Sequence, residues 1–315
     1  MNSLSQIQSL TIPMPNSAWS VNIYAIEGPA GYYLIDAGIA TEQARMLIKQ
    51  WVPRPLAGIL LSHGHQDHLG LAGELAQEQG CPVYLHSGEY QRLQNSELQI
   101  IKIGQLLTMG GFPKELLNEA IEAYQITRQN NILKLAGAEL RELTSEQKFS
   151  TELGILETIH TPGHTIGHCC FYLTEKKQLF SGDHILVGIS PNPILDIGTD
   201  GKRRLALVEY LKSLEKIASL SVKKLYPGHG QPFDRLDKVL EQFCDYHLKR
   251  QQLILQNLSQ HPQTPFQIVE KIYPGVRGLN IFLAISRVWG YLDLLDLEGQ
   301  IMVQIKDNTT YYSLH

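Results

Sequence analysis

The first third of the chain alternates short apolar runs with amphipathic stretches. Two of the apolar runs flank the turn sequence Gly28-Pro29-Ala30-Gly31 and so predict a pair of strands. After Thr41 the apolar residues recur at helical spacing, and threonine is a favourable residue for beginning a helix. This alternation predicts a layered α/β arrangement. The predicted strands are 20–26, 32–35, 56–61 and 81–86, and the predicted helices are 41–51 and 69–79.

The pattern changes at about residue 87, where mostly helical stretches joined by Gly110-Gly111 begin. We interpret residues 87–135 as a helical insertion into the α/β pattern. As a lid or pocket wall, it would cover a site. As a packing surface, it would contact the rest of the chain or a second copy in a homodimer. The sequence favours neither role over the other.

Strands and helices resume after the insertion, and the tail has its own pattern. Two predicted helices there are followed by a hairpin across Lys306-Asp307-Asn308-Thr309, an order typical of a winged helix. We therefore predict a catalytic domain at 1–233 and a helical, winged-helix-like C-terminal domain at 234–315. The predicted strands of this part are 155–160, 169–173, 178–180, 224–226, 301–305 and 310–313, and its helices are 205–220, 234–258, 266–273 and 279–295.

Composition adds a few limits to this picture. The net charge of −4 gives no overall attraction to nucleic acid or to an anionic membrane. The four cysteines contain no CxxC pair, and we interpret them as buried thiols. The N-terminus lacks a basic segment followed by an apolar core, and no apolar run approaches the length of about 20 residues that spans a bilayer. We therefore expect a cytoplasmic protein with no membrane partner.

Candidate chemistry is concentrated directly after the apolar run that ends at Leu61. Three imidazoles and one carboxylate lie within six residues there. When such groups crowd together they lose hydration and repel one another as cations, and a bound metal ion removes that cost. The cluster therefore predicts a metal site. Its members are His63, His65, Asp67 and His68.

Three later fragments each place a histidine or aspartate just past a predicted strand. Each has a glycine beside it, which permits a tight turn of the backbone. Strand ends are where layered α/β folds build their sites. Four such loops converging on one edge would supply ligands for two adjacent metal ions. The fragments are Thr161-Pro162-Gly163-His164-Thr165-Ile166-Gly167-His168, Ser181-Gly182-Asp183-His184 and Pro227-Gly228-His229-Gly230.

The ordered set HxHxDH, TPGHTxGH, SGDH and PGHG resembles the metallo-β-lactamase superfamily over about residues 19–233. The resemblance implies an α/β fold, the αββα sandwich, with two divalent metal ions at one edge. Zinc is our first choice of metal, with iron and manganese as alternatives, because histidine and aspartate suit all three. Nearby His160, His168 and His184 are interpreted as packing residues or as partners that orient ligands. By resemblance, His63, His65 and His164 hold one ion, Asp67, His68 and His229 hold the other, and Asp183 bridges them.

Two such ions hold a bridging hydroxide and clamp the attacked oxygen, so the predicted reaction is hydrolysis of a carbonyl or phosphoryl ester. Asp67 and Asp183 are the predicted catalytic carboxylates, and Asp67 can orient the hydroxide. The motifs contain no dedicated general acid, which favours a leaving group that departs as an anion. A thiolate is such a group, because the reference pKa of a thiol is about 8.5.

The substrate class depends on the branch of the superfamily that the chain resembles. TPGHTxGH resembles glyoxalase II, which hydrolyses a glutathione thioester, but Pro227-Gly228-His229-Gly230 stands where that enzyme has Gly-His-Glu. The C-terminal pattern resembles the branch called β-lactamase-like protein 2, which joins this core to a winged helix and includes a single-strand endoribonuclease. We predict a hydrolase of small-molecule thioesters or esters, with a metal-dependent endoribonuclease acting on RNA as the alternative. A non-enzymatic binding protein on this fold is the third hypothesis.

Overall fold

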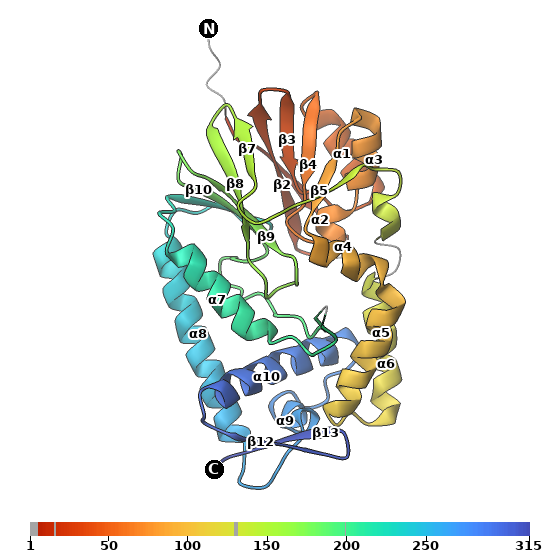
Figure 1. The fold of residues 1–315 in the computed structure, drawn as a ribbon, viewed down its shortest axis with the longest axis vertical. Helices are drawn as coiled ribbons and strands as arrows, with labels where there is room; N and C mark the ends of the chain where they lie inside the picture. The colour runs from red at the N-terminus through yellow and green to blue at the C-terminus, as the bar shows by residue number, and fades with distance from the viewer. Residues whose placement is uncertain (1–5, 16, 129–131, 199) are drawn as a thin grey trace. The chain divides into compact units, whose positions relative to one another are not determined.

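The computed structural model describes residues 6–15, 17–128, 132–198 and 200–315. Two compact units are built from segments that alternate along the chain (Figure 1). We call them the sandwich unit and the helical unit. The sandwich unit comprises Met1–Gln94, Asn130–Pro191 and Leu214–Val239, and the helical unit comprises Asn95–Gln129, Asn192–Ser213 and Leu240–His315.

The sandwich unit contains two β-sheets. The first has the order β1-β2-β3-β4-β5-β6, antiparallel from β1 to β3 and parallel from β3 to β6. The second has the order β11-β10-β9-β8-β7, and only the pair β10–β11 is parallel. The strands are β1 (Gln8–Pro13), β2 (Ser20–Gly28), β3 (Gly31–Ile35), β4 (Leu56–Leu60), β5 (Val83–Leu85), β6 (Leu140–Glu142), β7 (Lys148–Thr151), β8 (Gly154–His160), β9 (Cys169–Leu173), β10 (Gln178–Gly182) and β11 (Lys224–Pro227).

A core rich in aromatic residues joins the two sheets. Tyr24 and Leu60 of the first sheet belong to one buried cluster with Phe149, Phe171 and Phe180 of the second. A second buried cluster packs the first sheet against helices α1 and α3. The predicted layered α/β arrangement is therefore confirmed. The helices of this unit are α1 (Glu42–Trp51), α2 (Gln66–Leu69), α3 (Ala72–Gln79), α4 (Ser87–Gln94) and the 3-10 helix η1 (Ile132–Leu135), and the residues of α7 (Ala206–Ala218) and α8 (Leu236–Asn257) are divided between the units.

The helix predicted at 69–79 is divided in two, so the prediction of one continuous helix is wrong. The chain turns at Gly70, where a Cβ atom would lie 2.5 Å from the backbone nitrogen of Ala40. The first turn of helix, α2, begins earlier than predicted, at Gln66. As a result Asp67 and His68 lie on a helix rather than in a loop.

Three short strands had no counterpart in the sequence prediction: β1, β6 and β7. The last two span only three and four residues, too few to show the alternation by which strands are recognised. The helical prediction for 87–135 is confirmed for the described residues, and its part at 129–131 lies outside them. Its helices are divided between the units, since α4 and η1 belong to the sandwich unit and α5 (Ser96–Met109) and α6 (Lys114–Arg128) to the helical unit.

The helical unit has a core centred on Trp289. The indole of Trp289 donates a hydrogen bond to Tyr312 Oη at 2.8 Å, and the Arg203 guanidinium lies 4.5 Å from the centre of its ring. Arg203 in turn pairs with Asp293. Two helices followed by a hairpin are present in the predicted order, while the winged-helix assignment and the division at residue 233 stay predictions. These elements are α9 (Pro265–Ile272), α10 (Leu279–Leu297), β12 (Met302–Lys306) and β13 (Thr309–Ser313).

Within the described ranges, every helix is too short or too polar to cross a membrane.

Candidate metal site

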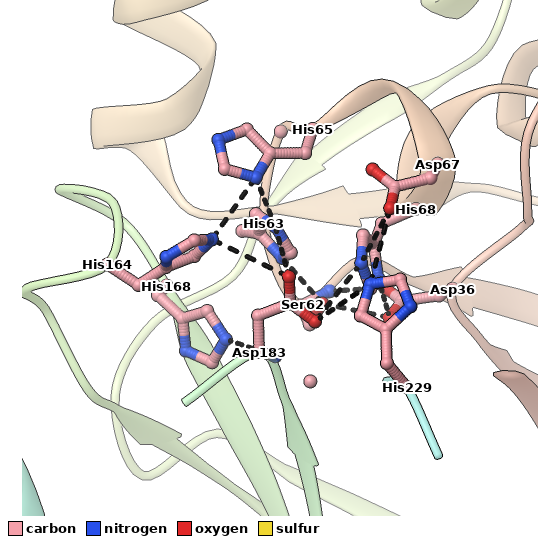
Figure 2. Close-up of polar contacts among 12 residues, drawn as sticks. Asp36, Ser62, His63, His65, Asp67, His68, His164, His168, Asp183 and His229 are labelled. Atoms are coloured by element: carbon pink, nitrogen blue, oxygen red, sulfur yellow. Dashed lines mark hydrogen bonds and ion pairs between the residues drawn. The ribbon is translucent and has the colours of Figure 1, made fainter. Parts of the chain in front are cut away.

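The seven predicted ligands come together in the sandwich unit, at the carboxyl ends of strands β4, β8, β10 and β11 (Figure 2). In each case a strand ends and a loop or a short helix turns its polar side chains toward the same place. The side chains form two groups, and within each group the candidate ligand atoms lie within 4.8 Å of one another. The first group is His63, His65, His164 and Asp183, and the second is Asp67, His68 and His229.

The first group is built mainly from imidazoles. His65 Nδ1 lies 2.9 Å from His63 Nε2 and 3.1 Å from His164 Nε2. The Oδ2 atom of Asp183 lies 3.9 Å from His63 Nε2 and 3.6 Å from His164 Nε2. Three ring nitrogens and one carboxylate oxygen therefore point into one small volume, which is a ligand set suited to zinc and similar divalent ions.

The second group contains more carboxylate. Asp67 Oδ2 lies 3.7 Å from His68 Nε2 and 3.3 Å from His229 Nε2. The Oδ1 atom of Asp183 lies 3.3 Å from each of the same two nitrogens. Asp183 thus presents one oxygen to each group, and it is the side chain that belongs to both.

Two atoms at the centre of the site test whether these residues fit a metal. His68 Nε2 and Asp183 Oδ1 are buried and lie 3.3 Å apart, but within the part of the chain that the structure describes neither completes a hydrogen bond. A buried polar atom without a hydrogen bond costs about 1–3 kcal/mol. A cation in contact with both atoms would remove that cost, so the residues present fit divalent metal ions.

The electrostatics of the two groups differ. Burial lowers the pKa of His63 well below its ordinary value, and the neighbouring His68 and His65 lower it further. Burial also acts to lower the pKa of His68, but the Asp183, Asp67 and Asp36 carboxylates outweigh it and raise that pKa well above the ordinary value. For His229, burial is opposed chiefly by Asp183, and the pKa is raised to about 10. His63 is therefore neutral, whereas His68 and His229 hold protons that a cation would replace.

Asp36 orients the second group, a role that the sequence did not reveal. Its Oδ1 accepts a hydrogen bond from the backbone of Ser62 at 2.7 Å, and its Oδ2 accepts from the Ser62 hydroxyl at 2.9 Å. Asp36 Oδ2 also lies 2.8 Å from His68 Nδ1, so this nitrogen carries a proton and Nε2 faces the site. The only signal in the sequence is an aspartate at the end of a predicted strand.

His168 supports the bridging aspartate from outside both groups. Its Nδ1 lies 2.8 Å from the Thr161 hydroxyl, and its Nε2 accepts a hydrogen bond from the backbone nitrogen of Asp183 at 3.2 Å. His160 is turned to another neighbour and stacks on His86 with ring centres 4.2 Å apart. His184, buried beside His168, also belongs to neither ligand group.

The loop of His229 is held by the first sheet. His229 Nδ1 lies 2.6 Å from the backbone oxygen of Ser20, and the Asn22 side chain donates to the backbone oxygens of Pro227 and Gly230. The Trp19 ring lies edge-on to the His229 ring with 6.0 Å between centres, and 48% of the tryptophan is exposed. An accessible apolar surface therefore lies directly beside one of the candidate ligands.

Comparison with known proteins places this geometry in a family. Residues 17–229 match the family model described as the metallo-beta-lactamase superfamily. A Bacillus subtilis protein named "Probable metallo-hydrolase YqjP" is 26% identical over 316 residues, which cover 96% of each chain. The beta-lactamase-like protein 2 homolog of Drosophila melanogaster is 31% identical over 176 residues, or 55% of this chain and 56% of that protein. The predicted resemblance is therefore confirmed.

Two further comparisons concern activity and fold. The atrochrysone carboxyl ACP thioesterase of Aspergillus fumigatus is 35% identical over 121 residues, which cover 38% of this chain and 35% of that protein. The crystal structure of a metallo-beta-lactamase family protein from Thermus thermophilus superposes with a TM-score of 0.75 at 25% identity and covers 98% of both chains. The predicted fold class is thus confirmed over nearly the whole chain.

Proposed function

The chain belongs to the metallo-beta-lactamase superfamily, and from this premise we propose that it is a hydrolase that uses two divalent metal ions. The observation that carries the proposal is the position of Asp183, whose two oxygens face two separate groups of ligands. A single carboxylate placed in this way is suited to bridging two cations.

We propose the following division of ligands, with zinc as the metal. One ion takes three imidazoles, and the other takes two imidazoles and a carboxylate. Histidine-rich sets of this kind suit zinc, while iron and manganese remain the alternatives to be measured. The ligands of the first ion are His63, His65 and His164, those of the second are Asp67, His68 and His229, and Asp183 is shared.

The side chains of the site would each have one task in hydrolysis. When bound, the two ions supply a nucleophilic hydroxide at neutral pH and stabilise negative charge on the substrate. Asp67, whose side chain is 18% exposed, would accept a hydrogen bond from that hydroxide and orient it. Asp183 fixes the separation of the two ligand groups, and Asp36 keeps His68 turned toward the site.

We propose a small-molecule thioester or ester as the substrate. The two ligand groups contain no side chain left over to protonate a leaving group, which suits a thiolate because it departs without a proton. The local similarity to a carboxyl ACP thioesterase supports the same chemistry. The exposed Trp19 ring beside His229 offers apolar contact to an acyl or thiol chain.

Metal analysis combined with a substrate panel tests this function. We expect two metal ions per chain and turnover of acyl-CoA or another thioester that chelation abolishes and Zn²⁺ restores. Glutathione thioesters, lactones and single-stranded RNA belong in the same panel. Metal-loaded protein that leaves every thioester and ester intact but cleaves RNA would overturn the proposal in favour of the nuclease.

A further inference from the structure

Glu89, on α4, is a buried carboxylate outside both ligand groups. Its side chain has no solvent exposure. Its Oε2 atom accepts a hydrogen bond from the Arg92 guanidinium at 2.8 Å and another from the backbone nitrogen of Gly64 at 3.0 Å. Its Oε1 atom accepts from the backbone nitrogen of Gly167 at 2.8 Å. One carboxylate therefore joins two loops that are about 100 residues apart in the sequence.

Both loops contain glycine where they meet Glu89. A Cβ atom on Gly64 would lie 2.7 Å from Glu89 Oε2, and one on Gly167 would lie 2.9 Å from the Cγ atom and the backbone nitrogen of Glu89. Any larger residue would force the loop away from the carboxylate. The close approach of Glu89 therefore gives a physical reason for glycine at these two positions of the metal-binding motifs.

The two loops carry the three imidazole ligands of the first proposed ion, and Asp67 and His68 of the second ion lie on α2, which begins directly after His65. Gly64 lies between His63 and His65, and Gly167 follows the turn that holds His164. His229, in contrast, is held through Ser20 and its loop through Asn22, on the first sheet. The backbone contacts of Glu89 are therefore made beside ligands of the first ion, and the loop of His229 lies outside them.

The charge on Glu89 is maintained despite its burial. Burial acts to raise the pKa of the carboxyl, but Arg92 and the hydrogen bonds that the carboxylate accepts outweigh it and lower the pKa to about 2. A buried carboxylate of this kind is costly unless its oxygens are all paired. The hydrogen-bond partners of the Glu89 carboxylate are Arg92 and the backbone N–H groups of the two metal-binding loops.

We propose that Glu89 is a positioning residue for the first metal ion, which sets the spacing of the loops that carry His63, His65 and His164. This inference rests on the proposed division of ligands between two ions. In Glu89→Gln, one acceptor oxygen becomes an amide donor, so one of the two loop N–H groups loses its partner and Arg92 loses its ion pair. The loop spacing is then no longer fixed, while the volume of the side chain is preserved.

Stepwise metal titration tests the proposal independently of catalysis. Apo wild type and Glu89→Gln are titrated with Zn²⁺ against a chromophoric chelator, and Co²⁺ spectra identify which ligand set is filled. His164→Ala and His229→Ala serve as references for losing the first and the second ion. We expect Glu89→Gln to lower the affinity of the His164-dependent step by about 10- to 100-fold and to leave the His229-dependent step within a few-fold of wild type.

A purely structural role for Glu89 predicts a different result. Ile48→Ala is the matched control, because Ile48 is a fully buried residue of the same unit on α1 and lies outside the metal-binding motifs in the sequence. If Glu89→Gln weakens both steps equally, as general destabilisation in Ile48→Ala would, or weakens neither, the assignment of Glu89 is overturned. If wild type itself binds one ion, the two-ion function fails, and Glu89 is judged by the affinity for that single ion.

A second variant keeps the test available if Glu89→Gln does not fold. Gly167→Ala places a methyl group 2.9 Å from the Cγ atom of Glu89 and 2.8 Å from His86 Nδ1, and it removes neither partner of the buried Glu89–Arg92 ion pair. We expect it to weaken the same metal-binding step and to reduce kcat more than it raises KM, because Trp19, the side chain proposed to contact the substrate, is left in place. Wild-type affinity at both steps in this variant would contradict the proposal.

Discussion

The two halves of the candidate site use different physical means to hold a cation. The first half gathers three imidazoles around Asp183 Oδ2, and burial keeps His63 neutral. The second half surrounds His68 and His229 with carboxylates, which raise the pKa of both histidines. Burial therefore favours the neutral, metal-binding form of His63, whereas His68 and His229 give up protons when a cation binds.

The difference extends to how each half is supported. The Glu89 carboxylate accepts hydrogen bonds from the backbone of both first-half loops and so fixes their spacing. The second-half histidines are themselves oriented by the hydrogen bonds that His68 donates to Asp36 and that His229 donates to the backbone oxygen of Ser20. In the first half the positions of the metal ligands depend on the spacing of the loops. In the second half they depend on the orientation of the individual imidazole rings. Single substitutions in each half can separate these two mechanisms.

The largest effect is expected where the halves meet. Asp183→Ala removes an oxygen from both groups, and we expect turnover to fall by more than about 100-fold, beyond what loss of a supporting residue costs. Metal content, measured by elemental analysis, should fall as well. Full turnover with unchanged metal content would refute the assignment of the site.

Removing a single ligand from one half should remove the metal ion of that half and leave the other ion bound. His164→Ala is expected to retain the second ion and His229→Ala the first, so that each variant binds about one metal per chain. Elemental analysis after dialysis against limiting Zn²⁺ measures this. Two variants that each lose both ions would show that the halves do not bind independently.

Asp36→Asn tests the orienting mechanism of the second half. Asp36 has φ of 60°, a left-handed conformation that asparagine adopts readily, so the backbone should persist. With the amide oxygen facing the backbone nitrogen of Ser62, the amide nitrogen takes the place of Oδ2 and can accept a hydrogen bond from neither His68 nor the Ser62 hydroxyl. We expect the affinity of the second ion to fall by about 10- to 100-fold in a chelator competition assay. If Asp36→Asn left the affinity for the second ion unchanged and weakened the affinity for the first, Asp36 would not be the residue that orients the second half.

The smallest effect concerns stability in acid. The pKa of Glu89 is about 2 in the folded protein against an ordinary value of 4.5. A lowered pKa stabilises the fold fully above the unfolded value and loses that contribution as the pH falls from 4.5 toward 2, by about 3 kcal/mol in all. Wild type should therefore lose unfolding free energy more steeply than Glu89→Gln between pH 5 and pH 3 in urea titrations. Equal slopes would indicate that Glu89 is not ionised in the fold.

Much of the site could be predicted because its ligands form short local motifs. His63, His65 and His68 are recognisable as a cluster without any knowledge of the fold, and Asp183 and His229 follow predicted strands. Asp36 and Glu89 carry no such local pattern. Their roles depend on contacts with Ser62 and Gly167, which only the folded chain brings near them.

The limits for the fold have a similar cause. The long apolar runs predicted most strands, but β6 and β7 are short and gain their partners from distant segments. The helix predicted across Gly70 is divided because the backbone packs closely against Ala40 there, and this contact leaves no trace in periodicity. The homodimer and the cytoplasmic location stay predictions.

The alternation of the two units along the chain has a consequence for protein engineering. Helices α5 and α6 reach the helical unit from the middle of the chain, and there they contact β13 and α10 from its end. No single cut releases either unit whole, because a fragment ending near residue 233 would keep α5 and α6 without the surfaces that they pack against. Terminal truncation is thus a poor way to isolate a minimal enzyme, and a shortened version would need internal deletions joined by designed linkers.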